Sequence, residues 1–209
     1  MRRKIGVLSI VIGVLAIVLA LLLYLYNSRE NEQAGKAAEE MLQEVQTIIT
    51  EMQTTEKPEI PQGAPSAEAE EPAAEPEPSQ EIQFGEYEYI GVLSLPSLEL
   101  TLPVLAECSD ALLKVAPCRD YGEIETDDLV IAAHNYRNHF GRLHELKYGA
   151  EIELTDMDGV EHQYTVAEIM IIQPTEVSLV WDSPYELVLY TCDYTNQNRV
   201  VVYCREVVS

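Results

Sequence analysis

The chain has 209 residues, enough for one ordinary domain with additional segments, and its formal net charge is −23. This charge argues against a nucleic-acid-binding protein, because the chain offers no basic stripe to phosphates. The acidic balance is best explained as a solvated surface and identifies no partner. The four cysteines, at positions 108, 118, 192 and 204, lack the C-x-x-C spacing of a zinc site.

Residues 1–29 are predicted to form a membrane anchor. Residues 5–26 carry no charge, and a helix of that length spans roughly 30 Å, the hydrocarbon thickness of a bilayer. Arg2, Arg3 and Lys4 precede this segment and mostly acidic residues follow it, so the N-terminus is expected in the cytoplasm. A cleaved signal peptide is the alternative, but its apolar region would be unusually long and no small-x-small cleavage site follows.

Two further segments separate the anchor from the globular part. Residues 30–55 are predicted to form a polar stalk helix, because Met41, Val45, Ile48 and Met52 recur at helical spacing. The stripe lasts less than three heptads, so a stalk is favoured over a committed coiled coil, and self-association stays open. Residues 56–81 are rich in Pro, Glu and Ala and are predicted to be an extended, disordered linker.

Residues 82–209 are predicted to form a mainly β domain. Turns are indicated at Asp158 and Gly159 and at residues 196–198, and short helical turns at 109–115 and 140–146. Pro103 is expected to divide the second strand. This pattern implies a closed or nearly closed β-barrel. Short runs rich in Val, Ile, Leu and Tyr suggest strands at 87–95, 98–105, 129–133, 151–155, 162–172, 186–191 and 199–207.

The last two predicted strands carry a chemically suggestive pair. One strand ends at Cys192, and after a short hairpin the next strand opens with Arg199. In an antiparallel pair these two residues become neighbours at one rim of the barrel. A cation stabilises a thiolate nucleophile, and a guanidinium can donate to an oxyanion. Taken alone, the pair is better explained by a buried cysteine and a strand-edge arginine bound to a carboxylate such as Asp193.

His134 adds a third candidate, because it ends the apolar run 129–133 and is therefore also delivered to a barrel rim. Its imidazole can serve as general acid and base beside a cysteine. The other histidines are weaker candidates. His139 and His144 lie in a polar segment, and His162 opens a strand after a turn and is expected to be solvated.

Several motifs, in order, resemble the sortase family over residues 85–207. Val-Leu-Tyr-Thr-Cys at 188–192 resembles Thr-Leu-x-Thr-Cys, and Ala133-His134-Asn135 resembles the family's histidine strand end. Arg199 followed by three valines resembles the arginine that opens the last strand. Ile-Gly-Val-Leu-Ser-Leu-Pro at 90–96 is similar to the first barrel strand. Four motifs in the right order are specific where each alone is weak.

The resemblance implies a membrane-anchored, eight-stranded β-barrel on the outer face of a Gram-positive-type envelope. It implies that Cys192 cleaves an LPxTG-like sorting signal of a secreted protein between Thr and Gly through a thioacyl-enzyme. His134 would protonate the leaving amine, and Arg199 would hold the peptide and the oxyanion. A peptidoglycan precursor or pilin amine would accept the acyl chain. No cofactor is expected.

Other residues near the motifs are candidates for secondary roles. Thr191 is a candidate substrate contact or an ordinary strand residue, and Asn135 orients His134 or ends the strand. Trp181 and Tyr185 lie in a loop that forms the sorting-signal groove in sortases, with packing on the barrel as the alternative. Calcium binding is conceivable for the acidic residues before the histidine strand, but a solvated loop is favoured. Those acidic residues are Glu123, Glu125, Asp127 and Asp128.

The sequence departs from the family pattern in three places. Val188 replaces a threonine, at the buried end of its strand. The hairpin between Cys192 and Arg199 is short, and the Asp-Pro-aromatic lid of many pilin-polymerising members is missing before Tyr87. Cys204 is predicted to point away from the face of Arg199.

The remaining cysteines and the competing functions stay open. Cys108 and Cys118 are either free or bridged. An inactive membrane-tethered β-barrel binding module of the same fold is the alternative function. A papain-like hydrolase is disfavoured because no helix follows the cysteine.

Overall fold

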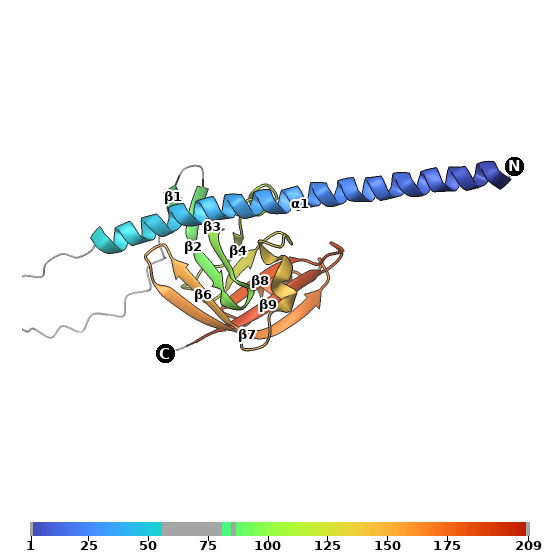
Figure 1. Ribbon diagram of the computed structural model, residues 1–209. Coiled ribbons are helices and arrows are strands. Elements are labelled where there is room, and N and C mark those ends of the chain that lie inside the picture. Colours follow the sequence, from blue (N-terminus) through green and yellow to red (C-terminus); the bar gives the residue numbers. More distant parts are fainter. Residues whose placement is uncertain (1, 56–80, 85–86, 208–209) are drawn as a thin grey trace, which may run out of the picture.

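The computed structural model describes residues 2–55, 81–84 and 87–207 (Figure 1). The predicted linker lies outside the described residues except for its last position, so its extended form stays a prediction.

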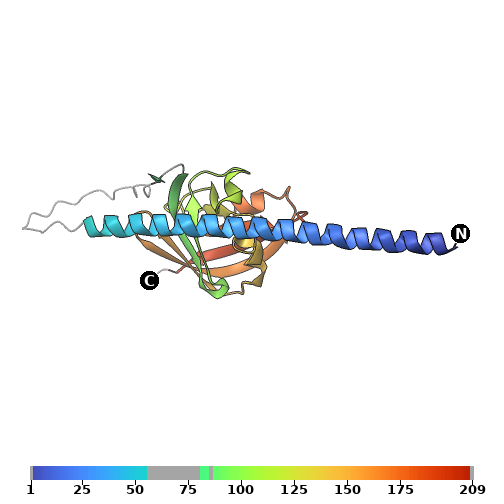
Figure 2. The ribbon, with the colours of Figure 1, turned by 45° about the horizontal axis from the view of Figure 1, so that its top comes forward.

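The anchor and the stalk form one continuous helix, α1 (Arg2–Thr55), of 54 residues, a length of roughly 80 Å. Its side chains from Ile12 to Tyr26 are exposed, and the helix is long and apolar enough to cross a membrane. The N-terminal half projects beyond the barrel, whereas the C-terminal half lies along it (Figures 1 and 2). The apolar stripe of the predicted stalk helix packs against the barrel, and Val45 and Ile49 are buried in this contact.

Eight strands close into a barrel. Their order is β2-β3-β4-β5-β8-β9-β7-β6, and β6 pairs back to β2. The predicted eight-stranded barrel is therefore confirmed, with β1 (Ile82–Phe84) added as a hairpin partner of β2. The strands are β2 (Tyr87–Leu95), β3 (Leu100–Leu105), β4 (Cys118–Tyr121), β5 (Leu129–Ala132), β6 (Glu151–Asp156), β7 (Glu161–Ile172), β8 (Leu187–Cys192) and β9 (Arg199–Glu206).

Pro103 does not divide β3, so that prediction was wrong. The proline lies within the strand opposite Val92 of β2, and the parallel pairing of β3 with β4 involves only Leu105 and Cys118. Most of that side of β3 therefore behaves as a strand edge, where a missing N–H costs no ladder hydrogen bond. The strand β4 was not predicted, because its sequence Cys-Arg-Asp-Tyr is short and half polar.

The connections are short. Three 3-10 turns occur in the described part of the chain: η1 (Pro96–Leu98), η2 (Leu112–Lys114) and η3 (Phe140–Glu145). The last two fall in the predicted helical turns, and Leu112 N–H donates to Ser109 Oγ at 3.2 Å. Gly159, at φ 80°, closes the predicted β6–β7 turn, and Asn196, at φ 56°, lies in the β8–β9 hairpin.

Alternation along β5, β8 and β9 separates two apolar faces. Leu187 and Leu189 face the main core inside the barrel, together with Val202. Val188 and Val201 face outward into a second cluster, which α2 (Ser178–Trp181) covers through Val180. A third cluster lies between α1 and the barrel wall. The outward face of β5, β8 and β9 carries the candidate site.

Candidate active site on the outer face of three strand ends

Cys192 and Arg199 lie directly opposite each other in the antiparallel ladder of β8 and β9. Directly opposed residues project to the same face with Cβ atoms about 4.5–5.5 Å apart. The prediction that these two residues are neighbours at one rim of the barrel is confirmed. Both side chains are half-buried and lie on the outward face that Val188 and Val201 share.

His134 reaches the same level from the other side of β8. β5 runs parallel to β8, with Ala132 beside Tyr190, and Ala133 N–H donates to the Tyr190 carbonyl at 3.2 Å. Continuing this register by two residues brings His134 beside Cys192, and both residues line the same pocket. His134, Cys192 and Arg199 therefore lie side by side at the ends of β5, β8 and β9, with the cysteine in the middle.

A pocket of about 680 Å³ opens beside Cys192 and His134. Its walls come from the loop after His134, from η3 and the β8–β9 hairpin, and from α1 through Asn27, Glu30 and Asn31. Among the hydrogen bonds of the described residues, none joins Cys192, His134 and Arg199 to one another. Catalytic hydrogen bonds are often long before substrate binds, so this arrangement is compatible with the expected roles.

The environment of His134 favours the neutral imidazole. Burial, the largest influence, lowers the pKa of His134, and the Lys114 ammonium lowers it further, whereas Asp110 and Glu30 act in the opposite direction. The Tyr136 ring lies over the imidazole, with centroids 4.9 Å apart. A neutral imidazole at neutral pH is ready to accept a proton.

Thr191 and Asn135 join the end of β5 to β8 and to the hairpin that follows it. Thr191, which is buried, donates from Oγ1 to the Ala133 carbonyl at 2.8 Å. Asn135 Nδ2 donates to the Asp193 carbonyl at 3.0 Å and to Asn196 Oδ1 at 3.3 Å. The residue after His134 is therefore tied to the residue after Cys192. Asn135 also lines the pocket, whereas Thr191 faces the interior.

Trp181 contacts β4, which lies next to β5 in the barrel. Its Nε1 donates to Asp120 Oδ2 at 2.9 Å, and the Tyr190 hydroxyl donates to the same oxygen at 2.8 Å. The Trp181 ring stacks on Tyr121 with centroids 5.7 Å apart. Since Tyr190 shares the outward face of β8 with Cys192, Trp181 borders the strip of sheet that leads to the thiol.

Tyr185 lies at the other end of β8, away from Cys192. Its hydroxyl donates to Glu168 at 3.2 Å, and the Arg205 guanidinium lies 4.3 Å from its ring centroid. Tyr185 precedes a six-residue strand that ends at Cys192, so the structure places it roughly 20 Å from the thiol. The loop position that suggested a substrate contact for both Trp181 and Tyr185 thus brings only Trp181 toward the site.

The other cysteines are placed away from the row of strand ends. Cys204 is fully buried in the main core, as strand alternation predicts, and burial raises its thiol pKa. Cys108 and Cys118 are free thiols, and the Cys118 thiol donates to the Ala116 carbonyl at 3.4 Å. The neighbouring Cys108 raises the pKa of Cys118, and burial raises it further. Cys192 is the half-exposed thiol that lines the pocket.

The other histidines have structural surroundings. His162 was expected to be solvated, and that prediction was wrong, because its Nε2 lies 2.9 Å from Asp156 Oδ2 across the β6–β7 hairpin. His139 is completely buried beneath α1, and its pKa falls to about 4 through burial. His144 packs edge-on against Tyr194, 5.2 Å between centroids.

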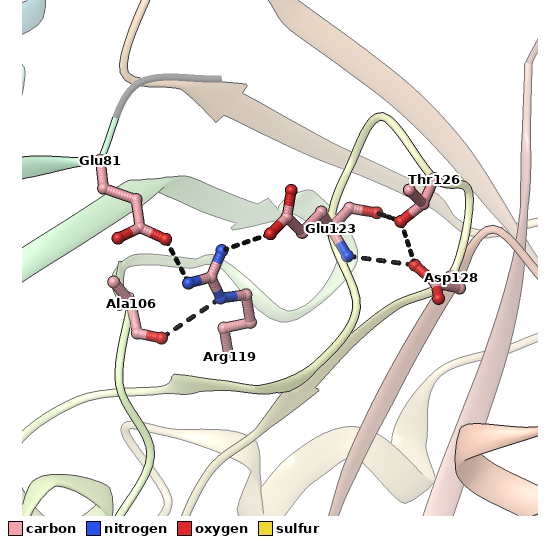
Figure 3. Close-up of polar contacts among 6 residues, drawn as sticks. All are labelled: Glu81, Ala106, Arg119, Glu123, Thr126 and Asp128. Atoms are coloured by element: carbon pink, nitrogen blue, oxygen red, sulfur yellow. Dashed lines mark hydrogen bonds and ion pairs between the residues drawn. The ribbon is translucent and has the colours of Figure 1, made fainter. Parts of the chain in front are cut away.

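The acidic loop before β5 is organised by its own hydrogen bonds (Figure 3). Asp128 Oδ1 accepts from Glu123 N–H at 3.1 Å and also from the Thr126 hydroxyl. Arg119 pairs with Glu81 and lies 3.9 Å from Glu123. No group of three or more His, Cys, Asp or Glu residues is placed to hold a metal in the part of the chain that the structure describes.

Sequence reasoning missed three contributors to the site. Asp120 lies in the unpredicted strand β4, and only its role as a shared acceptor reveals it. Tyr136 follows His134 by two residues, so an aromatic residue so near a candidate base was the available signal. Asn31 of α1 borders the pocket although it is far from the motifs in sequence, and no sequence signal indicates that contact.

Comparisons with known proteins agree with this geometry. A family model described as a sortase domain matches residues 93–207. Among curated proteins, none matches the chain.

Solved structures with a similar fold include three sortases. The chain is similar to sortase A from Corynebacterium diphtheriae, with 22% identity, a TM-score of 0.52, and 59% of this chain and 63% of that chain covered. It is also similar to a sortase D5 transpeptidase of Clostridium perfringens, with 17% identity, a TM-score of 0.51, and 57% and 79% covered. For sortase C1 from Streptococcus suis, the identity is 24%, the TM-score 0.51, and the coverage 59% and 75%. The match thus spans less than two thirds of the Corynebacterium chain.

Proposed function

Because this chain belongs to the sortase family, whose members are cysteine transpeptidases that anchor surface proteins or pilins, we propose that it is itself an envelope transpeptidase that uses Cys192 as nucleophile. The observation that carries the proposal is the row of His134, Cys192 and Arg199 at the ends of three adjacent strands, on one face. A nucleophile flanked by an acid/base on one side and a cation on the other is suited to acyl transfer.

The first half-reaction cleaves an LPxTG-like sorting signal between Thr and Gly. The proton of the Cys192 thiol passes to the neutral His134 imidazole as sulfur attacks the threonine carbonyl carbon. The Arg199 guanidinium donates to the oxygen that gains negative charge. When the C–N bond breaks, His134 gives its proton to the departing glycine amine, and a thioester remains on Cys192.

The second half-reaction runs through the same groups in reverse. An acceptor amine of a peptidoglycan precursor or a pilin attacks the thioester carbonyl, and His134 takes the amine proton. The C–S bond breaks, a new amide forms, and the proton returns to the Cys192 sulfur. The lowered pKa of His134 suits this step, because the base must be unprotonated when the amine arrives.

The outward face of β8 is the proposed seat of the sorting signal. Trp181 and Tyr190 are held by one Asp120 carboxylate oxygen beside this face. Their flat rings provide apolar walls, and Arg199 places a positive charge near Tyr190 on this face. Asn135 keeps the Cys192 hairpin against the His134 strand end, and we assign Thr191 the same structural task.

The proposed location is the outer face of a cell membrane of the Gram-positive type. Residues 5–26 would span the bilayer once, with Arg2, Arg3 and Lys4 on the cytoplasmic side. The secreted substrate and the envelope amine would then meet the barrel outside the cell.

A transpeptidation assay on the full-length chain in detergent tests this function. An LPxTG-type peptide and an amine acceptor should give ligated product, and Cys192→Ala should give none. Arg199→Ala should lower kcat by about 10²–10³-fold, the effect of removing one oxyanion donor.

Two matched controls separate the site from general damage. Arg205→Ala removes an arginine from the far end of the same strand, and Cys108→Ala removes another half-buried thiol. Both should stay near wild-type activity. Peptide binding without cleavage in the wild type would instead favour an inactive binding module, and product formation by Cys192→Ala would refute the nucleophile.

A further inference from the structure

The juxtamembrane part of α1 forms one side of the pocket that contains Cys192. Asn27, Glu30 and Asn31 line this pocket. They follow the uncharged run that ends at Tyr26 by one, four and five residues, which is about 2–8 Å along the helix axis. The element that would anchor the protein therefore also borders its reactive centre.

Hydrogen bonds attach α1 to the loop that begins at His134. Asn31 Oδ1 accepts from the backbone N–H of Arg137 at 2.9 Å. In return, Asn138 Nδ2 donates to the Asn31 carbonyl at 3.4 Å. Arg137 and Asn138 come three and four residues after His134, so one turn of α1 fixes the path of this loop.

Small side chains allow α1 to approach this loop closely. Ala34 and Ala38 are buried, and His139 is completely buried beneath the helix. A Cβ atom at Gly35 would come within 2.2 Å of Asn138 Nδ2. A larger residue at position 35 would thus displace Asn138 or lift the helix away.

A chain of tilted ring contacts links this docked helix to His134. His139 lies under α1, and its ring centroid is 5.5 Å from that of Tyr136. Tyr136 in turn lies 4.9 Å from His134. A shift of α1 would therefore change the burial of His134 and its position relative to Cys192.

The titratable groups around His134 come from three elements, and His139 among them is neutral at neutral pH. Lys114 and Asp110 lie in the segment after β3, Glu30 lies on α1, and His139 belongs to the loop after His134. Burial nevertheless remains the largest influence on the pKa of His134, and it lowers that pKa. If α1 moved away, water would reach the imidazole and its pKa would rise toward the ordinary value.

We propose that α1 is part of the active site, and that Asn31 is a positioning residue that holds the His134 loop against the Cys192 pocket. This inference rests on the proposed function. α1 borders the pocket but does not fill it, because about 680 Å³ stays open and both Cys192 and His134 are half-exposed. The helix therefore supports the reaction and is not an inhibitory lid.

Paired substitutions in the full-length chain test this role. Asn31→Leu keeps the approximate size of the side chain but removes the acceptor for Arg137, whereas Asn31→Asp keeps an acceptor oxygen. We expect Asn31→Leu to lower kcat by roughly 10–100-fold with little change in KM, because misplacing a catalytic group by about 1 Å has effects of that size. Asn31→Asp should restore most of the rate. Gln33→Leu, an exposed change two residues away, should leave kcat unchanged.

Gly35→Leu gives an independent route to the same result. This change favours the helix itself, since leucine has the higher helix propensity, yet it blocks the close approach to Asn138. It should therefore lower kcat as Asn31→Leu does, in a chain that stays folded by tryptophan fluorescence. If either variant kept the wild-type kcat, the positioning role would be refuted. A higher rate in both would identify α1 as a lid and overturn the proposal equally.

The His134 titration, followed by NMR of the imidazole, distinguishes failure of this inference from failure of the proposed function. The midpoint should move to higher pH in Asn31→Leu and Gly35→Leu but stay unchanged in Asn31→Asp and Gln33→Leu. This readout requires no turnover. If the wild type ligated no peptide, the proposed function would fail while the titration still decided whether α1 controls the burial of His134. An unchanged midpoint would overturn the inference alone.

Discussion

Among single residues, His162 and Asp156 form an ion pair that makes stability depend on pH. Their side chains are mostly buried and 2.9 Å apart. The hydrogen bond that His162 donates to the Asp156 carboxylate raises the pKa of His162. Burial raises the pKa of Asp156, but hydrogen bonds from His162 and from Val160 N–H outweigh it and lower this pKa. The pair therefore links the two strands of the β6–β7 hairpin most strongly when both partners are charged.

The sign of the pH dependence follows from these two shifts. The contribution of His162 is complete below about pH 6.5, its unfolded pKa, and is lost as the pH rises through the raised folded pKa. The contribution of Asp156 is present above about pH 4 and is lost as the pH falls through the lowered folded pKa. His162→Gln should cost about 1–2 kcal/mol near pH 5.5 and much less near pH 9. Thermal unfolding followed by the fluorescence of the single tryptophan measures this.

Glu161→Gln is the matched control for this prediction. It removes a charge from the exposed neighbouring residue and should leave the pH dependence of the wild type intact. A cost for His162→Gln that is equal at both pH values would contradict the charged pair.

Among the elements, the β8–β9 hairpin fixes the position of Cys192 opposite Arg199. Asp193 organises its turn, accepting from Thr195 N–H at 3.0 Å, Gln197 N–H at 3.1 Å and Asn198 Nδ2 at 3.0 Å. Loss of hydration raises the pKa of Asp193, but the hydrogen bonds from Asn198 and Thr195 prevail and lower it to about 2. The carboxylate therefore stays charged until the pH falls toward 2. The hydrogen bonds of the turn should thus persist at every pH well above that value.

Replacing Asp193 should uncouple activity from stability. Asp193→Ala removes the acceptor for four donors, the Thr195 hydroxyl included, so we expect kcat to fall roughly tenfold because Cys192 is less well placed. The melting temperature should change little, since the barrel core is untouched. Asp193→Asn keeps one acceptor oxygen and should retain more of the rate. A wild-type kcat in Asp193→Ala would show that the turn does not position the thiol.

The same elements show what sequence could predict. His134, Cys192 and Arg199 end or begin clearly apolar strands, so their delivery to a rim followed from strand pairing and the period of two. The strand β4 could not be predicted in this way, because Arg119 and Asp120 interrupt the apolar pattern. Asp120 was missed for the same reason. Trp181 and Tyr185 lie in one loop, and this position did not reveal that Trp181 binds Asp120 whereas Tyr185 lies against Arg205.

For the whole molecule, the unexpected feature is the docking of α1 on the barrel. The stripe containing Val45 and Ile48 indicated an amphipathic helix, but an apolar stripe does not specify what covers it. The covering surface includes Tyr89 and Val92 of β2, which are distant in sequence. The docked helix brings the pocket close to the end of the apolar run, so a chain anchored through residues 5–26 would hold its reactive thiol near the bilayer surface.

The most direct test of the central claim is the mass of the full-length chain after brief incubation with a sorting-signal peptide and no acceptor amine. Cys192 as nucleophile predicts a mass gain equal to the acyl portion of the peptide, on the fragment that contains Cys192. Hydroxylamine should remove this adduct, as expected of a thioester, and Cys192→Ala should never acquire it. An adduct on Cys108, or peptide cleavage by Cys192→Ala, would contradict the account.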